Sequence, residues 1–257
     1  EIYTLSLHDA LPILVDVFFR GGGRVSGKSW KRRIVLVRHG QTDWNLRYCF
    51  QGQTDVPLNA EGLAQAERLA ERFAQWPAEV VYSSPLQRAL STAQALAKPR
   101  GLRTVVLEGL KEINFGTWEG RSILGMEREE RGAFRTWMHD PFFNMPPGAE
   151  DWDSIRDRVE RAVEMILAEP HERIAVVTHG GIIRALFAVL LGLDPHTVWR
   201  LRVFNCSLSG VEIGPDGPAL VFSNDDLHLR WASESGSGDT GGHPSTKIGR
   251  ASCRERV

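Results

Sequence analysis

Two histidines, each closing an apolar segment of strand length, are the residues whose setting best suits chemistry. His39 closes the segment 34–39 and His179 closes the segment 174–179, and a glycine follows each. Such segments predict buried strands, and α/β folds bind ligands where strands of this kind end. We therefore expect both imidazoles at one edge of a sheet. Arg38 adds a permanent charge with planar donors suited to phosphate, so the pair predicts a phosphoryl-transfer site with a histidine nucleophile.

The residues that follow these histidines add weight to this interpretation. A single histidine at a strand end is more often structural than catalytic, but Gly40 lets the backbone approach an anion closely. Thr42 and Asn45 offer donors on the same loop, although turn and cap formation is their ordinary role. His179 and Gly180 repeat the arrangement on a second strand, which makes coincidence a poorer explanation.

One further arginine and two carboxylates are candidates for the same site. Arg88 lies one turn into a helix that the Ser-Pro step at 84–85 predicts. Exposure to solvent is the commoner role for a helical arginine, but the first turn of a helix also attracts anions. Glu112 or Glu119 could serve as a general acid, because a carboxyl group beside a bound phosphate tends to keep its proton. Their spacing does not choose between them.

The bulk composition is that of an ordinary globular protein. The chain has 257 residues, of which 42% are hydrophobic and 25% charged, with a net charge of −1. That length can bury one large core, and no apolar stretch reaches the roughly 20 residues of a membrane span. Near-neutral charge disfavours nucleic-acid binding. The three cysteines lack C-x-x-C spacing, so we expect neither a disulfide framework nor a zinc site, but a cytoplasmic protein.

Both ends of the sequence look foreign to the fold. Residues 1–13 and 247–257 can be encoded by DNA strings that are nearly reverse complements of each other and resemble a common sequencing adapter. We interpret them as translated adapter, which sequencing from an independent library would test. Residues 14–32 form an N-terminal arm of uncertain origin, and 233–246 predict a disordered tail rich in Gly, Ser and Asp. The domain proper is then 33–232.

Strands and helices alternate along that domain. This order predicts an α/β fold, a three-layer α/β/α domain with a mostly parallel central sheet and helices on both faces. We expect strands at 34–37, 80–82, 104–107 and 174–178, and a closing hairpin at 203–211 and 219–223. We expect helices at 61–76, 85–97, 122–139, 152–168 and 181–191. The segment 122–147 is expected to cover the pocket and set its selectivity.

Five stretches together resemble the histidine phosphatase superfamily, also called the phosphoglycerate-mutase-like superfamily. The tripeptide Arg-His-Gly alone is a weak signal, but the five occur in family order across nearly the whole domain. The branch that holds α-ribazole phosphatase and broad-specificity phosphatases is the most similar in pattern. The matching stretches are LVRHGQTDWN (36–45), QGQTDVPL (51–58), YSSPLQRA (82–89), LKEINFGTWEG (110–120) and VTHGG (177–181).

The resemblance implies a role for each site residue. His39 would attack phosphorus and become phosphohistidine, while Arg38, Arg88 and His179 would hold the phosphoryl oxygens. Glu112 would protonate the leaving oxygen and then activate water. Fixed cations would replace a metal, so no metal or other cofactor is expected. The residues expected to bind substrate are Arg38, Thr42, Asn45, Gln51, Gly52, Arg88, Glu112, His179 and Gly180.

Two positions depart from the family pattern and leave the substrate open. Cys49 stands where the family usually has an arginine, which Arg47 could replace from another direction on the loop. Pro-Gly-Ala-Glu at 147–150 replaces the more usual P-G-E-S or G-G-E-S type of sequence, keeping an acid but with Ala149 in place of a polar residue. Both departures concern substrate handling, not the phosphoryl chemistry.

The leading interpretation is a metal-independent phosphatase acting on a small phosphorylated metabolite, and a homodimer is a candidate assembly. A cofactor-dependent phosphoglycerate mutase is the alternative, but such mutases usually carry Gly-Trp where this chain has Gly52 and Gln53. A non-catalytic phosphate-binding domain would be expected to have lost His39 or Glu112. A two-metal hydrolase would need a carboxylate-rich ligand set, and the sequence offers only His39, His179, Asp225 and His228.

Overall fold

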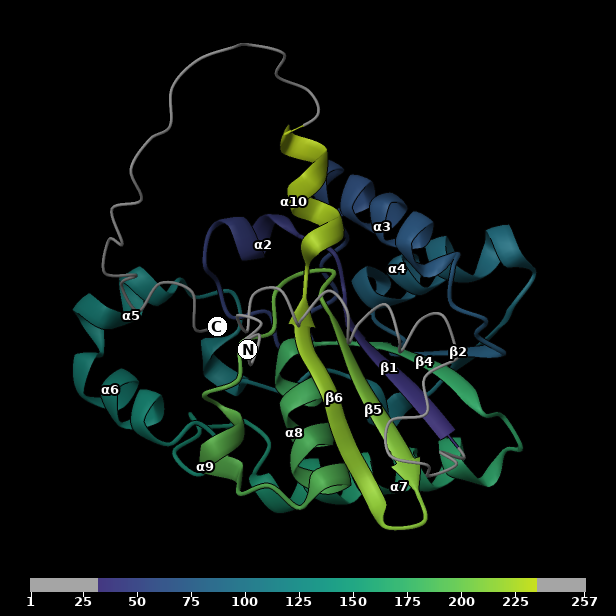
Figure 1. Cartoon of the computed structure of the whole chain (residues 1–257). Helices are drawn as coiled ribbons and strands as arrows, with labels where there is room; N and C mark the ends of the chain where they lie inside the picture. The colour runs from purple at the N-terminus through teal and green to yellow at the C-terminus, as the bar shows by residue number, and fades with distance from the viewer. Residues whose placement is uncertain (1–31, 235–257) are drawn as a thin grey trace, which may run out of the picture.

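A computed structural model of the chain describes residues 32–234 (Figure 1). The segments assigned to translated adapter, nearly all of the N-terminal arm and most of the predicted tail lie outside the described residues. The tail was expected to begin at residue 233, but a helix continues to residue 234. Within the described range no helix has the length and apolar character needed to cross a bilayer.

A six-stranded sheet with the order β3-β2-β4-β1-β5-β6 forms the centre of the domain. The first four strands in the chain pair in parallel, and the last two add an antiparallel hairpin at one side. The predicted α/β class and mostly parallel sheet are confirmed. The strands are β1 (Arg32–Arg38), β2 (Val80–Ser83), β3 (Arg103–Val106), β4 (Arg173–Thr178), β5 (Leu208–Gly214) and β6 (Gly217–Asp225).

Helices cover both faces of this sheet (Figure 1). One core joins alternate residues of β1 and β4, such as Leu36 and Val176, to α7 (Trp152–Ala168) and α8 (Gly180–Leu191). The other joins the intervening residues, such as Val37, to α3 (Ala60–Phe73) and α4 (Gln87–Ala97). Because successive side chains of a strand point to opposite faces, strands covered twice are apolar throughout. The short, continuous apolar segments of β1 and β4 in the sequence result from this burial on both faces of the sheet.

The remaining helices are short or lie beside the sheet. The C-terminal helix, α10, packs against α3, and helices α5 and α6 lie to one side of the sheet in Figure 1. These helices are α2 (Asp43–Leu46), α5 (Ile123–Glu129), α6 (Arg131–His139), α9 (Pro195–Val198) and α10 (Leu227–Glu234), with 3-10 turns η1 (Lys98–Arg100), η2 (Glu108–Leu110) and η3 (Gly116–Trp118).

Three predicted boundaries were wrong for local reasons. The helix expected from 85 begins at Gln87, because the Ser84 hydroxyl, which contacts His179 and accepts from the Leu86 amide at 3.3 Å, makes no cap hydrogen bond to the helix itself. The single helix expected over 122–139 breaks at Glu130, whose φ of −127° and ψ of 41° are not helical. The hairpin strand expected from 203 begins only at Leu208, since the chain turns through Cys206 at a φ of 53°.

Candidate active site

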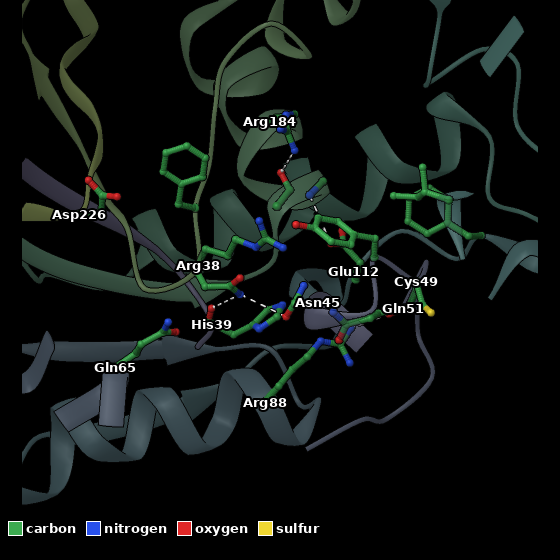
Figure 2. A pocket seen from close by; sticks show the side chains of 18 of the residues that line it. Arg38, His39, Asn45, Cys49, Gln51, Gln65, Arg88, Glu112, Arg184 and Asp226 are labelled. Atoms are coloured by element: carbon green, nitrogen blue, oxygen red, sulfur yellow. Dashed lines mark hydrogen bonds between the residues drawn. The ribbon is translucent and has the colours of Figure 1, made fainter. Parts of the chain in front are cut away.

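The carboxyl ends of β1 and β4 lie side by side and bring the two histidines together. Arg38 and Thr178 are partners in the parallel register, so His39 and His179 follow at matching positions. Their ring centroids are 5.1 Å apart. A cavity of about 330 Å³ opens at this edge and is lined by His39. In Figure 2, His39 lies between Arg38 and Arg88.

His39 is held as a neutral imidazole. It is 2% exposed, and its Nδ1 lies 2.7 Å from the Gly40 carbonyl oxygen. Because a carbonyl only accepts, Nδ1 carries the proton and Nε2 keeps its lone pair. Burial, followed by the charges of Arg88 and Arg38, lowers the pKa of His39 well below its usual value. A neutral ring with a free Nε2 pair has the electronic state that a nucleophile requires.

His179 lies beneath this pocket. It is fully buried, and its Nε2 is 2.8 Å from the Ser84 hydroxyl. Burial and then Arg88 lower the pKa of His179 well below its usual value. Its Nδ1 is buried without a partner among the described residues. Such an atom is expected to gain a hydrogen bond when a ligand arrives, because an unmet buried polar group is costly.

Arg38 and Arg88 place two fixed charges in the cavity wall. Arg38 donates to the Val203 carbonyl at 2.6 Å, and Arg88 donates to the carbonyls of Gly52 and Thr54 at 2.6 and 2.8 Å. Burial lowers the pKa of Arg88 to about 10, so it stays protonated at neutral pH. The Nε atom of each arginine is buried without an acceptor in the described part of the chain. Together they form a preorganised anion site.

The geometry distinguishes the two candidate carboxylates. Glu112 lines the cavity, where its Oε1 accepts from the Ile113 amide at 3.0 Å and its Oε2 from the Gly181 amide at 3.3 Å. Glu119 instead faces the loop after residue 52 and accepts from the amides of Gln53 and Thr54 at 2.9 and 3.0 Å. Glu112 is therefore the carboxylate that could exchange a proton with a ligand, and Glu119 holds the loop.

Removing the Glu119 carboxylate is expected to destabilise the fold. Glu119→Ala leaves at least two backbone amides without their charged acceptor, so we expect a loss of about 2 kcal/mol in the free energy of unfolding. Urea unfolding would measure it, with the exposed Glu127 changed to Ala as a control. Equal stability of the two variants would contradict the structural role assigned to Glu119.

Most residues expected to bind substrate line the cavity, but two do not. Thr42 is fully buried and forms a capping box with Asn45 at the start of α2, so its hydroxyl positions Asn45. His179 lies below the cavity surface, as described above. The cavity is lined by the expected nucleophile, His39, and by the expected substrate-binding residues Arg38, Asn45, Gln51, Gly52, Arg88, Glu112 and Gly180.

The structure also shows where the residues that depart from the family pattern lie relative to the cavity. Cys49 lines the cavity, whereas Arg47 is exposed and does not, so Arg47 does not replace the missing arginine. Glu150 accepts from Arg158 at 2.6 Å and lies outside the cavity. Of the segment 122–147, which was expected to set selectivity, only Ile123 reaches the cavity wall. The role of this segment in selectivity stays a prediction.

Sequence reasoning missed several polar residues of the cavity wall, among them Asn205 and Arg184. Asn205 donates to the carbonyls of His39 and Gly40 at 3.0 and 3.2 Å. Nothing in the sequence signals this contact, because 166 residues separate Asn205 from His39. Arg184 also lines the cavity. Its position four residues after Gly180 on a predicted helix puts both on one face, which is the signal that could have found it.

No group of three or more His, Cys, Asp or Glu side chains between residues 32 and 230 is arranged to hold a metal ion. Asp225, one of the ligands considered for a two-metal hydrolase, lies 4.0 Å from Arg72. A carboxylate beside an arginine is poorly placed to bind a divalent cation. The donor set of the cavity therefore suits an anion better than a metal.

Neutral, buried histidines make the fold sensitive to acid. Burial and then Arg72 lower the pKa of His228 to about 4, whereas the unfolded chain has a value of about 6.5. Between these pH values the unfolded state binds more protons than the folded state. The free energy of unfolding is therefore unaffected by the titration of His228 above pH 6.5 and decreases as the pH falls below that value. We expect His228→Gln to lessen the loss of unfolding free energy between pH 7 and 4 by about 3 kcal/mol. Urea titrations at both pH values would measure it, and an unchanged loss would contradict it.

The fold and the site together define a class: α/β domains in which paired histidines and arginines form an anion pocket at the carboxyl ends of the strands. The model of the histidine phosphatase superfamily (branch 1) matches residues 34–226. The chain belongs to this superfamily, as its motifs predicted.

Known members similar to this chain carry different functional names. The protein named probable phosphoglycerate mutase GpmB of Yersinia enterocolitica is 35% identical over 209 residues, which are 81% of this chain and 93% of that protein. The solved α-ribazole phosphatase of Shigella flexneri is 28% identical, with a TM-score of 0.68 over 75% of this chain and 96% of that one. A phosphoserine phosphatase of Entamoeba histolytica, solved with phosphoserine, is 29% identical, with a TM-score of 0.67 over 77% and 99%.

Proposed function

We propose that this protein is a metal-independent phosphatase that hydrolyses a small phosphomonoester through a phosphohistidine on His39. The neutral His39 ring carries the proposal, since its Nδ1 is committed to Gly40 and its Nε2 retains a lone pair at the cavity. Arg38 and Arg88 are fixed around it as cations. A phosphate dianion placed there would have its charge offset and its phosphorus open to attack.

The reaction runs in two balanced steps. In the first, Nε2 of His39 forms a bond to phosphorus, the ester P–O bond breaks, and Glu112 gives its proton to the leaving alcohol oxygen. In the second, Glu112 takes a proton from water as that water attacks phosphorus, and the P–N bond breaks to restore the neutral ring. Arg38, Arg88 and His179 stabilise the equatorial oxygens in both steps.

Phosphate release in the presence of a chelator tests the absence of a metal. Because arginines supply the charge that a metal would otherwise provide, we expect kcat to change by less than about twofold in excess EDTA. The assay would use the whole chain with nitrophenyl phosphate, before and after dialysis against chelator. Loss of activity restored by a divalent cation would contradict the proposal.

A phosphoglycerate mutase remains the second candidate, favoured by the name of the Yersinia relative. In this chain Gln53 donates from its side-chain amide to the Glu112 carbonyl at 3.1 Å and to Glu150 at 3.4 Å. Gln53 thus holds the backbone of Glu112, the proposed general acid, in place. A mutase would interconvert phosphoglycerates once primed with the bisphosphate, whereas a phosphatase would release phosphate.

A panel of phosphomonoesters would identify the substrate. It would contain α-ribazole phosphate, phosphoserine, 3-phosphoglycerate, sugar phosphates and nucleotides, each assayed for phosphate release and for isomerised product. The α-ribazole assignment rests on pattern and on the Shigella neighbour alone. Binding without turnover of any of them would support the non-catalytic alternative instead.

We also propose a reducing, cytoplasmic compartment, which the free thiols of Cys49 and Cys206 support. Burial raises the pKa of Cys206 to about 12, so that thiol is unreactive. The homodimer stays a prediction, and light scattering on the purified chain would test it.

A further inference from the structure

Arg184 is a third buried arginine at the cavity, and the catalytic scheme above does not use it. It projects from α8, is 5% exposed and lines the cavity wall. Its NH1 lies next to Arg38, since a methyl group at Gly180 would be 3.4 Å from NH1 and 3.6 Å from the Arg38 Cζ. In Figure 2, Arg184 lies on the far side of Arg38 and Glu112 from Arg88.

The guanidinium of Arg184 is fixed on three sides. Nε donates to the Leu201 carbonyl at 3.2 Å, NH1 donates to the Gly180 carbonyl at 3.1 Å, and Cζ lies 4.7 Å from the ring centroid of Trp199. Its NH2 forms no hydrogen bond with the described residues, whereas Nε and NH1 are both engaged. The guanidinium is thus held rigidly at the cavity wall, and NH2 is the group left to bind a ligand.

Arg184 forms no salt bridge, although the charge of Glu112 favours its protonated form. Burial lowers its pKa to about 10, so it is protonated at neutral pH. Buried arginines ordinarily pair with a carboxylate, because an uncompensated charge is costly. None of the acids in the described part of the chain forms a salt bridge with it, and Asp226, the other acid at the cavity, pairs with Arg230 at 3.0 Å.

A charge count indicates what Arg184 would bind. When Glu112 holds the proton that it must donate, a phosphate dianion offsets Arg38 and Arg88 and leaves Arg184 with one positive charge. We propose that Arg184 is a specificity-determining residue that binds a single negative charge, a carboxylate, on the alcohol part of the substrate. The planar donors of arginine match the two oxygens of a carboxylate. The substrate class is therefore a phosphomonoester of a small hydroxy acid.

Matched substrate pairs test this inference, which rests on the proposed phosphatase function. 3-Phosphoglycerate and glycerol 3-phosphate differ by a carboxylate, as do phosphoserine and phosphoethanolamine. We expect the wild type to prefer the carboxylate member of each pair in kcat/KM, and Arg184→Gln to reduce this ratio about 30-fold, the size of one charge-assisted contact. Arg184→Lys, which keeps the charge, should retain part of the preference. The exposed Arg135→Gln serves as the control.

Two results would overturn the inference. One is a wild type with no preference for the carboxylate members. The other is a folded Arg184→Gln that loses the same factor on both members, because that pattern indicates a purely structural role. If Arg184→Gln does not fold, as judged by its thermal transition, the wild-type ratio and Arg184→Lys decide instead.

A failure of the phosphatase proposal itself would look different. The wild type would then release phosphate from neither member of a pair. Calorimetric titration of His39→Ala with 3-phosphoglycerate and glycerol 3-phosphate would still decide the role of Arg184. Preferential binding of the carboxylate member that disappears in His39→Ala/Arg184→Gln supports it, while equal binding, or none, overturns it.

Discussion

His39→Ala is expected to reduce phosphate release by a factor of about 10⁴ or more, because it removes the atom that forms the covalent intermediate. Rapid quenching of the wild type with labelled substrate should trap a phosphoenzyme that is stable in alkali and labile in acid, the behaviour of a P–N bond. The variant should trap none. A phosphoenzyme with the opposite stability would place the phosphoryl group on a carboxylate and refute the mechanism.

The comparison requires that the variant stay folded. His139→Ala is the matched control, since His139 is exposed on α6 and lies outside the cavity. We expect both variants to keep the cooperative thermal transition of the wild type. Activity lost in both would mean that the assay reports damage to the fold and not removal of the nucleophile.

Glu112→Gln is expected to have the second largest effect, and its size should depend on the leaving group. The amide cannot donate the proton that an alkoxide needs, so kcat/KM for an alkyl phosphate should fall by about 10³-fold. Nitrophenolate leaves without that proton, so the rate of the first step with nitrophenyl phosphate should decrease far less. Stopped-flow measurement of nitrophenolate release should then show a burst, because the variant also lacks the base that activates water.

Glu119→Gln provides the control for this second prediction. Its carboxylate contacts backbone amides of the loop and does not line the cavity. We expect it to lower stability without separating the alkyl and aryl substrates. If Glu112→Gln lost the same factor on both esters, Glu112 would not be the proton donor, and the mechanism would need another acid.

The placement of the two histidines could be predicted from the sequence because it depends on local patterns. Each closes a short apolar segment, and strands buried on both faces bring their carboxyl ends to one edge. The choice of Glu112 over Glu119 could not be predicted from spacing. The two residues are seven positions apart on a segment without regular secondary structure, so the sequence does not determine which way either side chain faces. One amide that donates to Glu119 belongs to nearby Phe115, but those of Gln53 and Thr54 lie more than 60 positions away in the sequence.

Contacts between distant segments were beyond prediction for the same reason. Ser84 was expected to cap a helix, yet its hydroxyl accepts from the Leu86 amide before the helix begins and also contacts His179, 95 positions later. A polar side chain satisfies the nearest suitable group in space, and only the tertiary structure identifies that group.

The strand order implies that this protein acquires its activity late during synthesis. β4 lies between β1 and β2 in the sheet, yet it follows them by about 90 residues or more in the chain. Until β4 has left the ribosome, β1 and the β2-β3 pair each present an open edge, which is a state prone to aggregation. Non-local pairing of this kind slows folding. The same insertion delivers His179 beside His39, so the return of turnover during refolding would report that β4 has entered the sheet.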